Sequence, residues 1–230
     1  MTGVLVGACG LAGLGVGALL LVMIERVPER DSLRVRPYPE IRAGMRSSEG
    51  WLVVAGTGAL FAAMALRLGE SWALPAFLVF TAGLVALSVI DLRHQVLPNR
   101  IVYPLTEISV VLLGVAAIGD ADGEAFLRAL VCAVGAFLVF LLLHLVAPRG
   151  MGFGDVKLSF VLGLFLGWLG VGETVLGLFL GFVYGAVIGL VLLATKVRSR
   201  QQPIPFGPFL AAGTITGILF GNLILDWYTG

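Results

Sequence analysis

Charged residues and cysteines are scarce in this chain of 230 residues, of which only 13% are Asp, Glu, Lys or Arg and only two are cysteine. A soluble globular domain carries about 25% charged residues, so an ordinary water-soluble protein and a disordered chain are excluded. The cysteines, Cys9 and Cys132, have no CxxC partner, and we interpret both as small apolar packing residues. A net charge of +1 gives no reason to expect nucleic-acid binding.

Apolar residues fill the chain instead. They make up 59% of it, and its mean hydropathy is +1.03. Since a membrane-spanning helix needs about 20 apolar residues, the apolar runs predict an all-α, polytopic membrane helix bundle of about eight helices in a lipid bilayer. The predicted spans are Gly3–Ile24, Trp51–Leu66, Trp72–Ile90, Ile101–Ile118, Ala125–Ala147, Lys157–Val171, Thr174–Thr195 and Phe206–Asp226.

Basic residues alternate between the connections of these runs. Thirteen of the fifteen Lys and Arg residues fall in every second connection, and six of them are arginines between Arg26 and Arg46. Cytoplasmic loops are enriched in Lys and Arg. We therefore expect the N and C termini outside, and the loops near Arg93 and Lys157 in the cytoplasm.

Two acidic residues stand at the ends of apolar runs on the predicted cytoplasmic side. Asp91 closes the third run, and Asp155 opens the sixth. Acidic residues in membrane segments are costly, and they are functional hypotheses by default. Gly152 and Gly154 allow the backbone or a substrate to come close, so we predict an active-site loop there that includes Lys157. The alternative, in which Asp155 only stabilises the start of its helix, stays open.

A pair of carboxyl groups suits peptide hydrolysis. The two share one proton, so that one activates water as a base and the other protonates the carbonyl as an acid. Because such a pair titrates jointly, we do not assign base and acid. The sequence has no metal-ligand cluster, no Walker loop and no dinucleotide fingerprint, so we expect no metal and no organic cofactor. Neither His94 nor His144 has a catalytic partner in the sequence.

Four motifs, in chain order, carry a resemblance to a known family. They are residues 24–28 at the end of the first run, Asp91 followed by Leu97-Pro98, the Gly-Phe-Gly-Asp of residues 152–155, and residues 205–211. Together they resemble the prepilin peptidases, also called type IV leader peptidases, of the GxGD class of membrane aspartic proteases. The resemblance implies an aspartic endopeptidase with Asp91 and Asp155 as its catalytic pair. It also implies the substrate: the short basic leader of a type IV prepilin or pseudopilin, cut after a glycine on the cytoplasmic side.

The same resemblance implies a multi-pass protein of the bacterial cytoplasmic (inner) membrane. Residues 1–50 would form the first membrane helix with its Arg-rich loop, and residues 51–230 the helical protease core. Two departures stand out: Asn99 replaces an Asp that the family often has, and residues 25–50 hold no cysteine. Bifunctional members carry two CxxC pairs in that loop. A zinc-organised loop is therefore excluded, and the resemblance does not extend to N-methyltransferase activity.

Two other functions stay open from the sequence. A non-catalytic transporter or assembly scaffold would use the same carboxylates for protons or ions, although the two-half repeat common in transporters is not visible. A GxGD protease with another substrate is the second alternative. The sequence also leaves open whether the chain forms a homo-oligomer.

Overall fold

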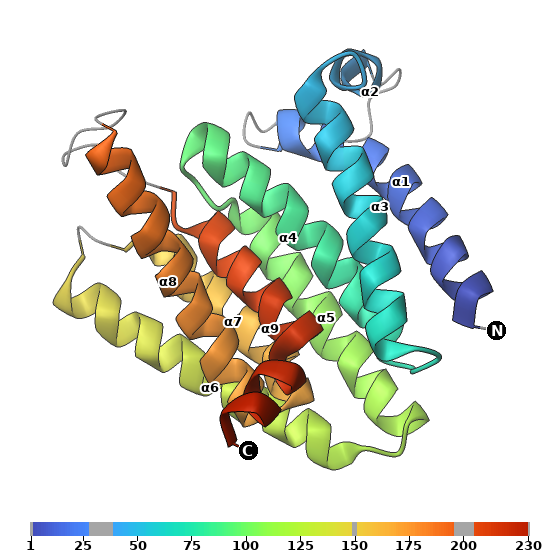
Figure 1. The fold of residues 1–230 in the computed structure, drawn as a ribbon, viewed down its shortest axis with the longest axis vertical. Coiled ribbons are helices and arrows are strands. Elements are labelled where there is room, and N and C mark those ends of the chain that lie inside the picture. The colour runs from blue at the N-terminus through green and yellow to red at the C-terminus, as the bar shows by residue number, and fades with distance from the viewer. Residues whose placement is uncertain (1, 28–38, 149–150, 196–204, 230) are drawn as a thin grey trace. The chain divides into compact units, whose positions relative to one another are not determined.

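The computed structural model describes residues 2–27, 39–148, 151–195 and 205–229. Within these ranges the chain is helical and contains no β-strand, which confirms the predicted all-α class (Figure 1). The helices of the described chain are α1 (Thr2–Arg26), α2 (Pro39–Gly44), α3 (Ser48–Leu68), α4 (Leu74–His94), α5 (Asn99–Gly119), α6 (Gly123–Val146), α7 (Phe153–Leu169), α8 (Val171–Ala194) and α9 (Gly207–Thr229). The predicted basic residues Arg30, Arg34, Arg36, Arg149, Lys196, Arg198 and Arg200 lie outside the described residues.

Seven of the described helices are long and apolar enough to cross a membrane. They are α1, α3, α4, α5, α6, α8 and α9, and each corresponds to one predicted span. The short sixth run corresponds to α7, which has 17 residues and is not among the seven. A multi-pass membrane protein is thus supported, whereas the count of eight spans and the outward termini stay predictions.

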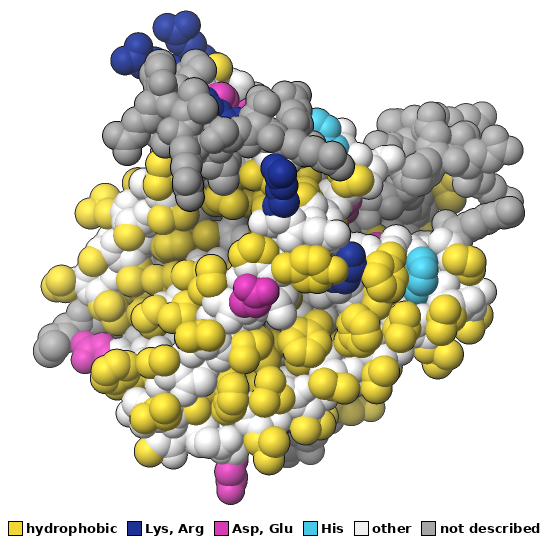
Figure 2. Space-filling view, turned by 180° about the vertical axis from the view of Figure 1, so that it is seen from behind, with side chains coloured by type: hydrophobic (Ala, Val, Ile, Leu, Met, Phe, Trp, Pro, Cys, Tyr) yellow, Lys and Arg dark blue, Asp and Glu magenta, His cyan; other side chains and the backbone are white. Residues whose placement is uncertain are grey.

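The helices bear their apolar side chains on the outside as well as inside. Leu52 on α3 is 73% exposed and Leu190 on α8 is 67% exposed, and hydrophobic side chains cover most of the face in Figure 2. In water such a surface would drive aggregation, but it suits the hydrocarbon of a bilayer. By contrast, α7 is buried on almost all sides from Val156 to Trp168, as expected for a helix that is apolar all round.

The chain forms two compact units. The first unit is Met1–Ile90 with Pro98–Asp122, and the second unit is Asp91–Leu97 with Gly123–Gly230. This grouping leaves the predicted division into residues 1–50 and 51–230 as a prediction. In the first unit α1 lies along α3, and in the second α7 packs against α6, α8 and α9 (Figure 1).

Glycines let the paired helices approach closely. On α1, a Cβ at Gly17 would lie 2.8 Å from the Val54 Cα of α3. On α7, a Cβ at Gly163 would lie 2.7 Å from the Cys132 carbonyl oxygen of α6. Small residues at such crossings are the usual basis of helix packing in lipid. Both Cys9 and Cys132 are buried and free, which agrees with their predicted packing role.

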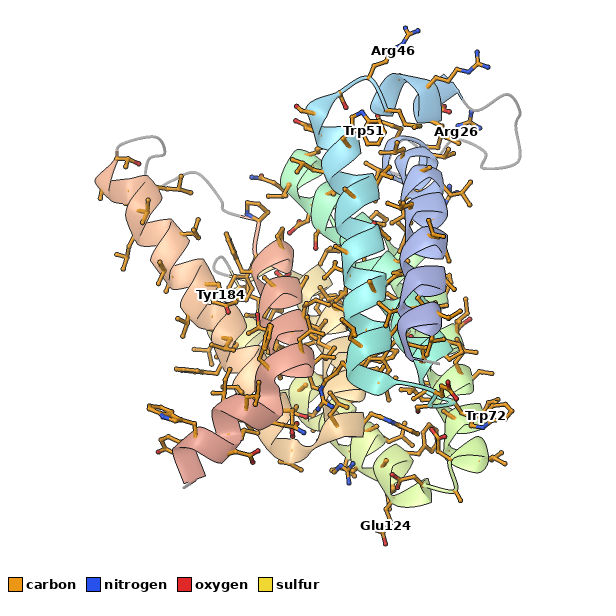
Figure 3. All side chains as sticks on the ribbon, turned by 45° about the vertical axis from the view of Figure 1, so that its right-hand side comes forward. Arg26, Arg46, Trp51, Trp72, Glu124 and Tyr184 are labelled. Atoms are coloured by element: carbon orange, nitrogen blue, oxygen red, sulfur yellow. The ribbon has the colours of Figure 1, made fainter. Side chains whose placement is uncertain are left out.

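Polar and aromatic side chains mark the ends of the first unit. Arg26 at the end of α1 donates to Glu40 of α2, with Nε 2.7 Å from Oε1, and this hydrogen bond holds the pKa of the Glu40 carboxyl below its usual range. Figure 3 shows Arg26 and Trp51 at one end of the unit and Trp72 at the other. Trp51 is 54% exposed and Trp72 is 61% exposed. Exposed tryptophans at both ends are typical of interfacial anchors.

The second unit contains an arginine that caps α7. The Nε of Arg128, on α6, donates to the Gly167 carbonyl at 3.0 Å, and its Nη2 donates to the Trp168 carbonyl at 2.7 Å. The last carbonyls of a helix have no partner inside the helix. Arg128 therefore satisfies the C-terminal end of the helix whose first turn carries Asp155.

Candidate active site

Asp91 lies in the last turn of α4, and its side chain is buried, with 6% exposed. Its Oδ2 accepts a hydrogen bond from the backbone N–H of Gly207, at 3.0 Å. Gly207 is the first residue of α9, and both residues belong to the second unit. A helix N-terminus offers free N–H groups and a positive dipole end to an anion. The carboxylate of Asp91 is therefore held by a backbone donor 116 residues further along the chain.

The chain turns sharply after Asp91. Gln95 has φ of 54°, and its N–H donates to the Asp91 carbonyl at 2.8 Å. A residue in the left-handed region is a common way to end a helix. This turn leads to Leu97, the leucine of the predicted Leu-Pro motif, which returns to the site.

Leu97 lies between two glycines of the other motifs. A Cβ at Gly154 would lie 3.0 Å from the Leu97 Cβ, and a Cβ at Gly207 would lie 3.5 Å from the Leu97 Cδ2. Three motifs that are far apart in the sequence therefore meet at one side chain. The sequence alone predicts the motif but not this contact.

Asp155 lies in the first turn of α7 and is also buried, with 7% exposed. Its N–H donates to the carbonyl of Gly152 at 3.1 Å. Burial, together with the nearby Asp91 carboxylate, raises the pKa of Asp155 to about 7, against the opposite effect of a hydrogen bond from the Gly152 backbone. The structure thus brings the two predicted aspartates together in one unit, near enough for the Asp91 carboxylate to raise the pKa of Asp155.

Two glycines lie next to the carboxyl oxygens, and at one of them, Gly207, a side chain would collide. A Cβ at Gly207 would lie 2.8 Å from the Asp91 Oδ2, closer than real Cβ atoms come to other atoms. A Cβ at Gly152 would lie 3.4 Å from the Asp155 Oδ2. The backbone therefore comes close to a carboxyl oxygen of each aspartate at a glycine. Gly207 lies in a motif that the sequence predicts, but its role as a donor was not predicted.

The remaining predicted residues lie beside the site. The Nζ of Lys157 lies over the Phe153 ring, 5.0 Å from its centroid. His144, for which the sequence predicts no role, has its Nδ1 2.8 Å from the Met151 carbonyl oxygen. His94 is the last residue of α4. In the described part of the chain, no group of three or more His, Cys, Asp or Glu residues is arranged to hold a metal ion.

These features define a helical membrane protein with two buried carboxyl groups. Asp155 lies in the first turn of α7, and Asp91 is bonded to the first residue of α9. Residues 78–193, which include both aspartates, match the type IV leader peptidase family. The chain belongs to this family, which confirms the resemblance predicted from its motifs.

Three curated relatives illustrate the similarity, and each is named prepilin leader peptidase/N-methyltransferase. The protein of Stutzerimonas stutzeri is 36% identical over 178 residues, covering 77% of this chain and 60% of the relative. The protein of Xanthomonas campestris pv. campestris is 35% identical over 211 residues, covering 89% and 70%. The Bacillus subtilis protein is 32% identical over 172 residues, covering 75% and 66%. The chain thus spans 60 to 70% of the length of these relatives. No solved structure matches it.

Proposed function

We propose that this protein is a membrane-embedded aspartic endopeptidase that removes the short basic leader from type IV prepilin-like precursors. The observation that carries the proposal is the buried pair of Asp91 and Asp155 in one unit, in which the Asp91 carboxylate raises the pKa of Asp155. Membership of the type IV leader peptidase family, and the names of the relatives, support the substrate class.

The proposed reaction needs one proton shared by the pair. The ionised carboxylate takes a proton from a water molecule as its oxygen attacks the scissile carbonyl carbon. The protonated carboxyl gives its proton to the carbonyl oxygen, which forms a tetrahedral intermediate. The C–N bond then breaks as the leaving nitrogen takes the proton that the first carboxyl group received from water. The other carboxylate takes back a hydroxyl proton from the collapsing intermediate, so the pair again holds one proton. The N–H of Gly207 stabilises Asp91 in the steps where that carboxyl group is ionised, and base and acid are roles of the pair rather than of one residue.

Glycine backbone lies close to both carboxyl groups, and this supports a small residue at the cleaved bond. We propose that the leader is cut after a glycine at the cytoplasmic face, while the apolar helix of the precursor stays in the membrane. The protein would then reside in the bacterial cytoplasmic (inner) membrane, with prepilin or pseudopilin as its partner. Lys157 and the loop glycines Gly152 and Gly154 would line the approach to the carboxyl pair.

The test is cleavage of a prepilin by the purified protein in detergent or lipid. We expect Asp91→Asn and Asp155→Asn each to reduce turnover at least about 1000-fold, since either change removes the shared proton chemistry. The matched control is Glu124→Gln, an exposed acid at the start of α6 (Figure 3), which should cleave normally. Near-normal turnover by either aspartate variant, with insertion intact, would contradict the assignment.

The substrate is tested separately from the mechanism. Replacing the leader glycine with a bulky residue should abolish cleavage, because the proposed site accepts a glycine before the cut. Cleavage that is indifferent to this change would favour a GxGD protease with another substrate. Sequencing the N-terminus of the product reports the position of the cut.

A further inference from the structure

His144 contacts the segment that leads to the second aspartate. It lies in the last turn of α6, and its Nδ1 is 2.8 Å from the carbonyl oxygen of Met151. A carbonyl oxygen can only accept, so this ring nitrogen carries the hydrogen. The imidazole also lies against the Phe153 ring, with the ring centroids 5.6 Å apart. His144 therefore contacts a backbone carbonyl, that of Met151, and a side chain, that of Phe153, in the segment that precedes Asp155.

This segment has little stiffness of its own. Gly152 and Gly154 lack side chains, and glycine backbones adopt many conformations. The N–H of Asp155 bonds to the Gly152 carbonyl, so the placement of Gly152 determines how the first turn of α7 begins. Met151 precedes Gly152 and is 8% exposed. Fixing the Met151 carbonyl therefore fixes the residue on which that turn depends.

Phe153 contacts two other side chains of the second unit. His144 lies against its ring, and the Lys157 ammonium lies over it, 5.0 Å from the centroid. Phe153 is nevertheless 45% exposed, so burial alone does not hold the ring in place. A cation above an aromatic face is attracted to it electrostatically. The two side chains thus stabilise one orientation of the residue that lies between the loop glycines.

We propose that His144 is a positioning residue for the Asp155 carboxyl group, acting through its Nδ1–H bond to Met151 and its ring contact with Phe153. The inference rests on the proposed function, since it assigns His144 a part in proteolysis. It predicts that losing the donor misplaces Asp155 for the chemical step while leaving the binding of substrate largely intact.

Substitutions that differ only in the reach of a donor test this role. In His144→Asn the amide nitrogen stands at the distance of Nδ1, whereas in His144→Gln it stands one bond further out. His144→Phe keeps a ring and removes the donor. We expect the Asn variant to keep kcat within about threefold, and the Gln and Phe variants to lose about tenfold in kcat with KM little changed. Leu145→Ala, the adjacent and exposed residue of α6, is the control and should behave as wild type.

Amide hydrogen exchange gives a readout that does not depend on activity. Exchange at residues 151–155 should quicken in the Gln and Phe variants and stay near wild type in the Asn variant. If wild type cleaves no prepilin but exchange follows this pattern, the proposed function fails and the positioning role stands.

Other outcomes overturn the positioning role. Equal kcat for the Asn and Gln variants would do so, even if the Phe variant fails to fold. Wild-type turnover and unchanged exchange in the Phe variant would do so as well.

Discussion

At the scale of single residues, backbone groups set the surroundings of Asp91. Its Oδ2 accepts the N–H of Gly207 at 3.0 Å, and a Cβ at Gly207 would lie only 2.8 Å from that oxygen. Gly207 therefore serves Asp91 in two ways: its N–H donates the hydrogen bond, and its lack of a side chain leaves space for the carboxylate. No other amino acid can supply the donor without moving either the carboxylate or the start of α9.

Gly207→Ala should reduce proteolysis by roughly tenfold or more, because the added methyl group must displace the Asp91 carboxyl group and lengthen its hydrogen bond. The measurement is kcat/KM on a prepilin, with the thermal unfolding midpoint as a check of folding. Gly135→Ala on α6 is the control, since a Cβ there meets nothing within 4 Å. Equal activities for the two variants would show that the Gly207 contact does not matter to the site.

The acid–base chemistry of the pair predicts a dependence on pH. Burial and the nearby Asp91 carboxylate raise the pKa of Asp155 to about 7, so the shared proton is lost as the pH rises through that value. Turnover should then fall on the alkaline side, by about tenfold per pH unit well above 7. The profile of kcat between about pH 5 and about pH 9 checks this, with Glu124→Gln as the control. A kcat that stays constant across the alkaline range would contradict it.

The sequence predicts a site residue when its position in an apolar chain costs free energy whatever the residue contacts after folding. Asp91 and Asp155 are visible in the sequence because a carboxylate at the edge of an apolar run needs a reason. The parts played by Gly207, Leu97 and His144 were not predictable in the same way. Each depends on a contact made by folding, and the Gly207–Asp91 pair is 116 residues apart. A glycine or a leucine in an apolar chain carries no signal of such a contact.

At the scale of helices, α7 differs from its neighbours. It is short, it is buried along most of its length, and it carries the second aspartate in its first turn. Its far end is closed by Arg128, which donates to the carbonyls of Gly167 and Trp168. The helix is thus held at one end by a charged donor and at the other by the loop that His144 contacts.

Arg128→Gln should destabilise the second unit by about 1 to 3 kcal/mol, because two charge-assisted hydrogen bonds are lost in a partly buried position. The thermal unfolding midpoint in a single detergent should fall accordingly. Arg100→Gln, which changes an exposed arginine of α5, should leave it nearly unchanged. A midpoint for the Arg128 variant equal to that of the control would mean that the cap contributes little.

Helix existence was easier to predict than helix ends. The apolar runs located every long helix, but α7 begins at Phe153 rather than at the predicted Lys157. The glycines that suggest an irregular break instead form the start of the helix. Similarly, α3 begins at Ser48 because Ser47 accepts the N–H of Gly50 in its side-chain oxygen, three residues before the predicted Trp51. The short helix α2 has no apolar run and was missed.

At the scale of the whole molecule, the charge pattern predicts how the chain lies in the membrane. The connection at Asp120 to Glu124 is acidic, and the connection at Arg93 to Arg100 is basic. Because basic loops stay in the cytoplasm, we expect these two connections on opposite sides. The structure supports a helical membrane protein, while the direction of insertion comes from the charges alone.

Single cysteines at positions 94 and 124 test this orientation, after Cys9 and Cys132 have been replaced by Ala. A membrane-impermeant thiol reagent should label position 124 in intact cells and should label position 94 only after the membrane is opened. Labelling of both positions, or of neither, in intact cells would contradict the predicted insertion. The variants should still cleave prepilin, which shows that the labelled protein is folded.

Leu97 couples the two helix ends that lie at the carboxyl pair. Its side chain lies against both Gly154 and Gly207. The segment after Asp91 therefore packs against the N-terminal ends of both α7 and α9. A motion that separates these two helix ends has to break the contacts of Leu97 with at least one of them. The relative placement of the two helix ends that carry or contact the carboxyl groups therefore depends on a hydrophobic residue that takes no part in proton transfer.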